Sequence, residues 1–170
     1  MSDPDSTWGT LRSKIVLWLQ EDQYDEAASI ADEAVQLAEK LYGPHHPNVA
    51  ISLTDRARCY RPKGKFTEGE PLLQRALAIR EKARGLEHPD VAESLFNLAC
   101  LYSTQGRFKE AIALHEQALS IREKILGSEH VEVANSLDRL GKLYALSKDV
   151  DKLAEAKRCH ERALASDTDS

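Results

Sequence analysis

Apolar residues recur along this chain at the three- and four-residue spacing that places side chains on one face of a helix. Within residues 91–102 the apolar stripe consists of Val91, Leu95, Leu98, Ala99 and Tyr102. Gly106 interrupts it, a second stripe follows in residues 108–121, and Gly127 stands where a helix C′ glycine belongs. No stretch alternates as a strand would, so the pattern predicts two helices joined by a short turn.

The same helix pair is repeated at an offset of 42 residues. The phrase "HPNVAISLTDRARCY" at 46–60 returns as "HPDVAESLFNLACLY" at 88–102 and as "HVEVANSLDRLGKLY" at 130–144. The second helix agrees too, because "QRALAIREK" at 74–82 matches "EQALSIREK" at 116–124. A repeat of this length indicates stacked supersecondary units.

A weaker copy precedes these, so the chain is predicted to hold four repeats. They cover approximately residues 1–42, 43–84, 85–126 and 127–170, the last with about three extra residues near "SKDVDKLAE". Two short helices cannot bury their apolar faces alone, whereas stacked pairs can. The sequence therefore predicts a single all-α repeat domain over residues 1–170.

Several residues at the repeat junctions carry local predictions. Pro47 and Pro89 stand where a first helical residue tolerates the missing N–H, and Pro62 is expected to end the first helix of the second repeat early. Histidines recur before these helices, and one repeat between neighbours separates them too far to share a metal, so they are predicted to cap or pack the turn: His46, His88 and His130.

Two tryptophans lie in the divergent first repeat. Trp18 takes the place of Tyr102 and is expected in the core. Trp8 is expected either to cap the end of the array or to contact a partner. His115 opens "HEQAL", but Leu119 stands where a zinc-protease motif needs its second histidine, so His115 is expected to pack between helices.

Composition narrows the function. Apolar residues make up 42% and charged residues 30% of 170, with a net charge of -5. This balance suits a cytoplasmic protein with a real core and disfavours nucleic acid or membrane as partner. Three cysteines form neither a metal pattern nor a disulfide framework. No arrangement of nucleophile, base and orienting group stands out, so neither an enzyme nor a cofactor is predicted.

These residues resemble a known family. The helix pair resembles the tetratricopeptide repeat. It has an aromatic residue at the end of its first helix, a glycine before an aromatic residue in the turn, and Ala-Leu late in its second helix. The 42-residue length, with "G-x-x-H-P-x-V-A-x-S-L" and "A-L-x-I-R-E-K", is similar to the repeats of kinesin light chain and nephrocystin-3. The resemblance implies a right-handed superhelical solenoid whose first helices line a concave groove.

The resemblance also implies where a ligand would bind. Positions five and nine before the aromatic look into the groove, and those two before it share roughly the same face. The candidate contacts at these positions are Asn97, Arg139, Asn135, Lys142, Glu93, Asp55 and Arg58. Repeat domains that grip a C-terminal carboxylate place Asn and Arg where Asn97 and Arg139 stand, and Arg offers a bidentate fork.

Three interpretations of that face stay open. It binds a peptide carboxylate, it binds another extended or helical peptide, or Arg139 merely pairs with Glu93 or Asp55 across neighbouring helices. The leading function is a non-catalytic scaffold that binds a peptide segment of a protein partner in the groove. The alternative is a structural spacer or a homo-oligomer that associates through the uncapped ends of the array.

Overall fold

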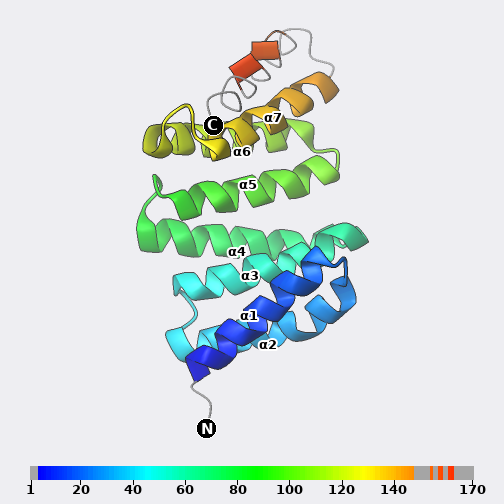
Figure 1. Cartoon of the computed structure of the whole chain (residues 1–170), viewed down its shortest axis with the longest axis vertical. Coiled ribbons are helices and arrows are strands. Elements are labelled where there is room, and N and C mark those ends of the chain that lie inside the picture. The colour runs from blue at the N-terminus through cyan, green and yellow to red at the C-terminus, as the bar shows by residue number, and fades with distance from the viewer. Residues whose placement is uncertain (1–3, 148–153, 155–156, 159–160, 163–170) are drawn as a thin grey trace. The chain divides into compact units, whose positions relative to one another are not determined.

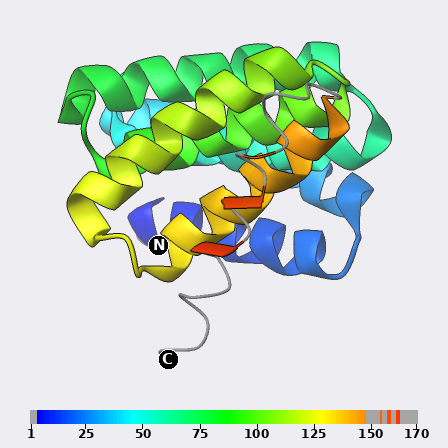
Figure 2. The same ribbon diagram turned by 90° about the horizontal axis from the view of Figure 1, so that it is seen from above.

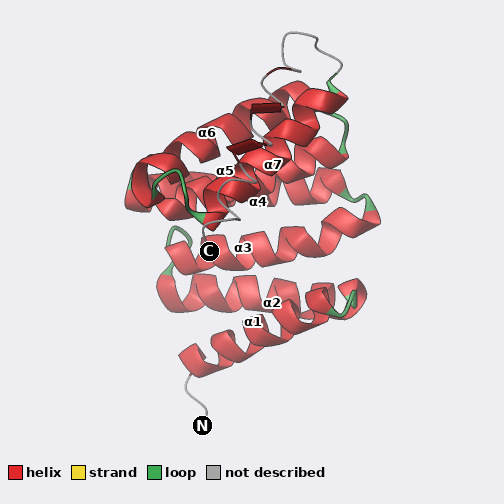
Figure 3. Cartoon of the chain, turned by 45° about the horizontal axis from the view of Figure 1, so that its top comes forward, coloured by secondary structure: helices red, strands yellow, loops and turns green. Residues whose placement is uncertain are grey.

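The computed structural model describes residues 4–147, 154, 157–158 and 161–162. This part of the chain is made of helices joined by short loops and holds no strand (Figures 1 and 3). The helices are α1 (Pro4–Gln20), α2 (Tyr24–Tyr42), α3 (Pro47–Tyr60), the 3₁₀ turn η1 (Arg61–Lys63), α4 (Phe66–Arg84), α5 (Pro89–Thr104), α6 (Phe108–Leu126) and α7 (Val131–Leu146). The three extra residues predicted near "SKDVDKLAE" lie largely outside the described residues.

The chain divides into two compact units, Met1–Gly85 and Leu86–Ser170, called here the N-terminal and C-terminal units. In the N-terminal unit, α1 packs on α2 and α3, and α3 packs on α2 and α4. In the C-terminal unit, α6 packs between α5 and α7, and the turn at 127–130 reverses the chain between α6 and α7 (Figure 2). The all-α helix-pair fold predicted from the sequence is confirmed.

The helices begin as the sequence predicted. Pro47 and Pro89 are the first residues of α3 and α5. The repeated histidines are N-caps, and the Nδ1 atom of each accepts a hydrogen bond from the backbone N–H two residues later: 3.2 Å at His46, 3.1 Å at His88 and 3.2 Å at His130. The imidazole satisfies one of the donors that a helix start leaves free. Capping therefore explains why the histidines recur.

The helix ends also follow the sequence. Gly127 follows α6 with φ at +85°, a conformation that side-chain-bearing residues rarely adopt, and its N–H donates to the carbonyl of Glu123. Pro62 shortens the first helix of the second repeat as predicted. Helix α3 ends at Tyr60 after 14 residues, whereas α5 and α7 run for 16, and the chain continues as the 3₁₀ turn η1.

Small residues line the contacts between helices. In the N-terminal unit, fully buried Ala27, Ala31 and Ala34 of α2 form one core cluster with Ile15 of α1 and Cys59 of α3. Alanine at these crossing points lets neighbouring helices approach closely, since interaxial distance depends on the side chains at the contact. Trp18 packs partly buried against this cluster, as predicted for the aromatic at the end of the first helix.

Trp8 belongs to the core, so the expectation that it caps the array or contacts a partner is wrong. Its side chain is 9% exposed and packs in a second cluster with Val35 and Leu53. Its ring meets Tyr42 edge-on at 5.5 Å, and its Nε1–H donates to the Oγ of Ser52 at 2.9 Å. The register of α1 directs the Trp8 side chain toward α3, where the Ser52 hydroxyl accepts its hydrogen bond.

The repeated serine accepts a buried hydrogen bond in two of the first helices, α3 and α7. In the N-terminal unit Ser52 accepts from Trp8, and in the C-terminal unit Ser136 accepts from a guanidinium nitrogen of Arg122 at 2.7 Å. Arg122 is itself buried, and its guanidinium also donates to the carbonyl of Glu132 at 3.3 Å. The Ser-Leu pair is therefore repeated for two reasons, with leucine filling the core and serine satisfying a buried donor.

Removing the hydroxyl of Ser52 should destabilise the N-terminal unit. Ser52→Ala leaves the Trp8 N–H buried without an acceptor, which costs about 1–3 kcal/mol. The measurement is the free energy of unfolding in urea, compared with Ser29→Ala. Ser29 is exposed and bonds only the carbonyl of Glu26 in its own helix, so its loss should change stability by about 0.5 kcal/mol or less. Equal effects of the two changes would contradict the assignment.

Candidate functional site

Helices α5 and α7 carry five of the seven candidate contacts. Glu93 and Asn97 lie on α5, the first exposed and the second half-buried. Asn135, Arg139 and Lys142 lie on α7 at the i, i+4 and i+7 positions of one helical face, and all three are exposed. We call Asn97, Asn135, Arg139 and Lys142 the polar face of the C-terminal unit.

The side chains of this face differ in the hydrogen bonds and ion pairs that they already make within the chain. The Nδ2 of Asn97 donates to the carbonyl of Glu93 at 2.9 Å, and the Nζ of Lys142 pairs with Asp138 at 2.7 Å. Arg139 makes no hydrogen bond or ion pair with any residue in the described part of the chain. The expected alternative, in which Arg139 pairs with Glu93 or Asp55, is therefore not what the structure contains.

A buried aromatic and cationic cluster links the three helices of the C-terminal unit. His115 of α6 is 1% exposed, and its ring meets Phe96 of α5 edge-on at 5.0 Å. The guanidinium of Arg122 lies 4.8 Å from the centre of the same Phe96 ring, and Glu132 pairs with it at 3.3 Å. The prediction that His115 packs between helices is confirmed. Its Nδ1 is buried without a hydrogen-bond partner.

His115 is held neutral by its surroundings. Burial, followed by the positive charges of Arg139 and Arg122, lowers the pKa of His115 to about 4. Neighbouring cations oppose a further positive charge, and a buried site cannot hydrate one. Arg139 therefore acts electrostatically on the core beneath the polar face, although its own side chain is exposed.

Asp55 of the N-terminal unit is not an exposed groove residue, so the expectation of an accessible acid there is wrong. Its side chain is 6% exposed because α1 and α3 enclose it with two guanidinium groups. Arg12 Nε lies 2.9 Å from Oδ2, and Arg58 lies 3.7 Å from Oδ1. Arg12 also stacks over Trp8 at 5.3 Å. Arg58 is exposed, but its guanidinium forms an ion pair with Asp55.

The sequence did not single out Arg12, because it belongs to the divergent repeat and stands one residue before the position expected to face the groove. The pairing became visible only when α1 and α3 were placed side by side.

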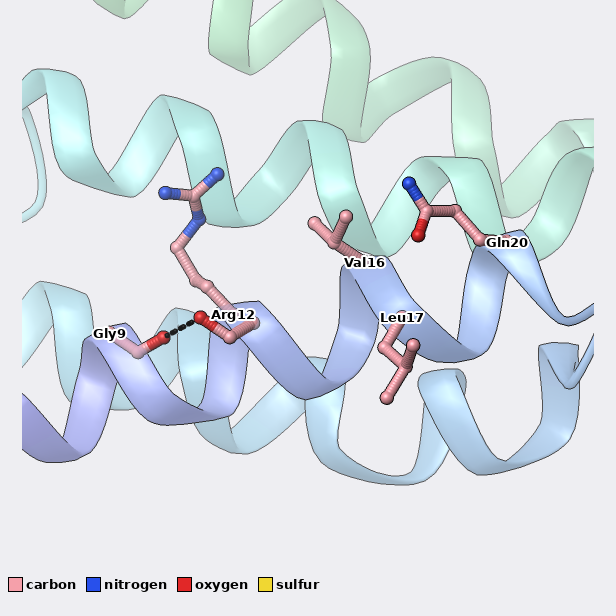
Figure 4. Close-up of a pocket in the computed structure, with 6 residues that line it drawn as sticks. Gly9, Arg12, Val16, Leu17 and Gln20 are labelled. Carbon is pink, nitrogen blue, oxygen red and sulfur yellow. Dashed lines mark hydrogen bonds between the residues drawn. The ribbon is translucent and has the colours of Figure 1, made fainter.

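A shallow hollow of about 310 Å³ runs along α1 (Figure 4). Its lining comes from one helix: Gly9, Arg12, Ser13, Val16, Leu17 and Gln20. The side chains of Arg12, Val16 and Gln20 point to one side of the helix and that of Leu17 to the other (Figure 4). Gly9, Ser13 and Val16 stand nine, five and two residues before Trp18, which are the groove positions of the first repeat.

Other chemistry is not assembled in the described part of the chain. There, no group of three or more His, Cys, Asp or Glu side chains converges as metal ligands, and no helix is long and apolar enough to cross a bilayer. Burial, and then the nearby Asp55 carboxylate, raises the pKa of the Cys59 thiol to about 11. That thiol therefore stays protonated and is a poor nucleophile at neutral pH.

Stacked helix pairs with capped starts and alanine crossings define the class of helical repeat proteins. The tetratricopeptide repeat model matches residues 10–63, 55–124 and 105–169, so this chain belongs to the tetratricopeptide repeat family. Repeats of this family generally serve as scaffolds for protein–protein interaction.

Solved structures give the same fold. The crystal structure of a Podosopora anserina putative kinesin light chain with nearly identical TPR-like repeats is 28% identical, with a TM-score of 0.84, over 100% of this chain and 79% of that one. BtubC (BKLC) from P. vanneervenii is 24% identical, with a TM-score of 0.85, over 99% of this chain and 66% of that one, and shows the fold alone. The repeats are thus similar to those of kinesin light chain.

Curated relatives share only a short stretch. A secreted RxLR effector protein of Plasmopara halstedii, RXLR-C07, is 41% identical over 44 residues, which is 26% of this chain and 14% of that protein. The RxLR effector protein SFI4 of Phytophthora infestans is 39% identical over 44 residues, or 13% of its length. The chain therefore matches about one seventh of the length of these relatives.

Replacing His115 should remove an acid sensitivity of the C-terminal unit. Because the folded pKa lies below the usual 6.5, the stabilisation is complete above pH 6.5 and is lost as the pH falls toward 4. The shift corresponds to about 3 kcal/mol. His115→Leu, which introduces the residue found at the matching Leu73, should flatten that dependence. Urea unfolding at pH 7 and pH 4.5 measures it, with exposed His45→Gln as control. An unchanged pH dependence in His115→Leu would contradict this explanation.

Proposed function

We propose that this chain is a non-catalytic interaction module that binds a peptide segment of a partner protein on the first-helix face of its repeats. The observation that carries the proposal is Arg139. It is an exposed guanidinium at a variable position of the repeat and has no partner in the described part of the chain. A structural arginine is normally paired, as Arg122 is with Glu132, so an unpaired one is available to a ligand.

The polar face offers a defined set of bonds. Arg139 presents five N–H donors in a fixed fork, suited to a carboxylate or to two peptide carbonyls. Asn97 uses one amide hydrogen within its own helix, which leaves the other hydrogen and the oxygen for a peptide main chain. Asn135, one turn before Arg139, offers the same pair of functions without such a bond in the described chain.

Charge favours a ligand with an acceptor at Arg139. Lys142 adds a cation one turn along α7, although Asp138 offsets it, and Glu93 lies beside Arg122, whose charge it stabilises. Arg139 thus carries a positive charge that no carboxylate in the described part of the chain pairs with. Of the two remaining candidates, Asp55 is enclosed by Arg12 and Arg58, so we do not place it or Arg58 in direct contact with the peptide.

The test is capture of partners from lysate by the folded chain and by Asn97→Ala/Arg139→Ala. Loss of the charged and amide bonds should weaken binding at least about tenfold, as expected for a hydrogen bond to a charged group. The matched control is Lys109→Ala/Gln117→Ala, two exposed residues of α6, which should bind as wild type.

A photo-crosslinking residue separates contact from an indirect effect. Placed at Asn135 it should label the partner, and placed at Gln117 it should not. Two results together would overturn the proposal: both double variants still capture the partner, and only the residue placed at Gln117 labels it. The interface would then lie outside the first helices.

A further inference from the structure

Leu17 of α1 is a large apolar side chain that the N-terminal unit leaves half exposed. It stands one residue before the aromatic of its repeat and is 50% exposed. The matching residues are buried, since Cys59 of α3 is 0% exposed and Leu143 of α7 is 3% exposed. Those two helices pack against the second helix of the preceding repeat, α2 or α6 respectively. The packing of α1 on α2 and α3 does not cover Leu17 to the same extent.

The hollow on α1 is the groove between two rows of side chains. Its six lining residues form two rows spaced by four positions along the helix: Gly9, Ser13 and Leu17 in the first row, and Arg12, Val16 and Gln20 in the second. Figure 4 shows the second row on one side of the helix and Leu17 on the other. Rows of this spacing are the ridges by which α-helices pack, with the ridge of one helix lying in the groove of the other. The hollow thus has the form that receives another helix.

The first row combines a bulky side chain with an empty space. A methyl group at Gly9 would meet no side chain or neighbouring helix within 4 Å, so the space above Gly9 is open. Leu17 stands in the same row, and Ser13 lies midway between the two residues. The bulky side chain and the empty space therefore lie at equal distances on either side of Ser13.

Polar groups at the centre of the groove are already bonded within the chain. The Ser13 hydroxyl donates to the carbonyl of Gly9 at 3.0 Å. Arg12 is the charged residue of the lining, and its guanidinium is paired with Asp55 at 2.9 Å. Burial of a polar group is unfavourable chiefly when the group loses its partner, and these groups keep theirs. The groove therefore suits an apolar helix surface better than it suits a peptide carboxylate.

We propose that two copies of this chain associate through α1, with Ser13 of each copy at the two-fold axis. The two helices are antiparallel, and the first row of each lies in the groove of the other. Leu17 of each copy then fills the space above Gly9 of the second copy. A second copy is the fitting occupant because one row carries both the bulky side chain and the space that it fills, at the symmetric positions that a two-fold contact requires.

The contact is isologous and closes as a dimer, because the same surface is used on both copies. It involves none of the residues of the polar face, so it goes beyond the proposed peptide binding and stands independently of it. One pair of helices makes a small interface, of the size found in weak complexes. Association is therefore expected at high concentrations of the chain.

The first experiment is analytical ultracentrifugation of the full chain over a concentration series that extends to the millimolar range. The wild-type mass should rise toward that of two chains and no further. Leu17→Ala removes the side chain that fills the groove, twice in each dimer, and should weaken association about tenfold or more. The matched control is Leu86→Ala, which shortens another exposed leucine and should associate as wild type.

Exchanging the bulky and the empty position gives the sharper test. Gly9→Leu fills the space in both copies and should weaken association at least about tenfold, the scale of losing the two buried leucines. The fold is retained, because the space is open and glycine is unfavourable inside a helix. Gly9→Leu/Leu17→Ala again sets a leucine opposite a small residue, so it should recover most of the wild-type association. Circular dichroism checks that each variant is folded.

Cross-linking locates the two-fold axis. Ser13→Cys should give a disulfide-linked dimer on mild oxidation, whereas Ser29→Cys, at an exposed position of α2, should give no more than the wild-type background. A wild-type mass equal to one chain at every concentration overturns the proposal. So do equal effects of Leu17→Ala and Leu86→Ala, an exchange variant no better than Gly9→Leu, and equal cross-linking at the two serines.

Discussion

The structure depends on small residues at the points where helices cross. Fully buried Ala27, Ala31 and Ala34 let α2 lie close to α1 and α3, and Ala111 and Ala118 occupy the corresponding places on α6. Each such position has little volume of its own, so stability comes from the larger side chains that close approach brings together. The 42-residue repeat reflects that requirement at the positions of Ala34, Ala76 and Ala118, which are alanine in each of these second helices.

Close packing also decides what happens to polar groups. A hydroxyl or guanidinium drawn into such an interface needs a partner, and the chain meets the need locally. The hydroxyl of Ser52 accepts a hydrogen bond from the Trp8 N–H, and that of Ser136 accepts one from Arg122. Asp55 forms an ion pair with Arg12. The exposed polar groups left after these pairings are the ones available for binding, so Asp55 is removed from the candidate contacts and Arg139 remains among them.

The sequence predicted the helix pairs, the histidine caps, the stop at Gly127 and the early end of α3, because each follows from local geometry or from the repeat itself. It failed where two helices had to be placed together. Trp8 was assigned to the end of the array because its partner Ser52 lies 44 residues away. Asp55 was placed in the groove because it stands five residues before Tyr60, and its partner Arg12 lies in the divergent repeat 43 residues away. For the polar face, the position of each residue along the repeat predicted that Asn135, Arg139 and Lys142 are exposed. It did not predict which of them pair with another side chain.

The buried hydrogen bond to the repeated serine has an evolutionary consequence. Its donor comes from α1 in the N-terminal unit and from α6 in the C-terminal unit, while Ala38 stands on α2 where Arg122 stands on α6. Loss of residues 1–42 would therefore leave Ser52 without its donor Trp8, even though the helical pattern of the other repeats persisted. The first repeat is thus not interchangeable with the third at this bond, because its donor is on the first helix and that of the third repeat is on the second.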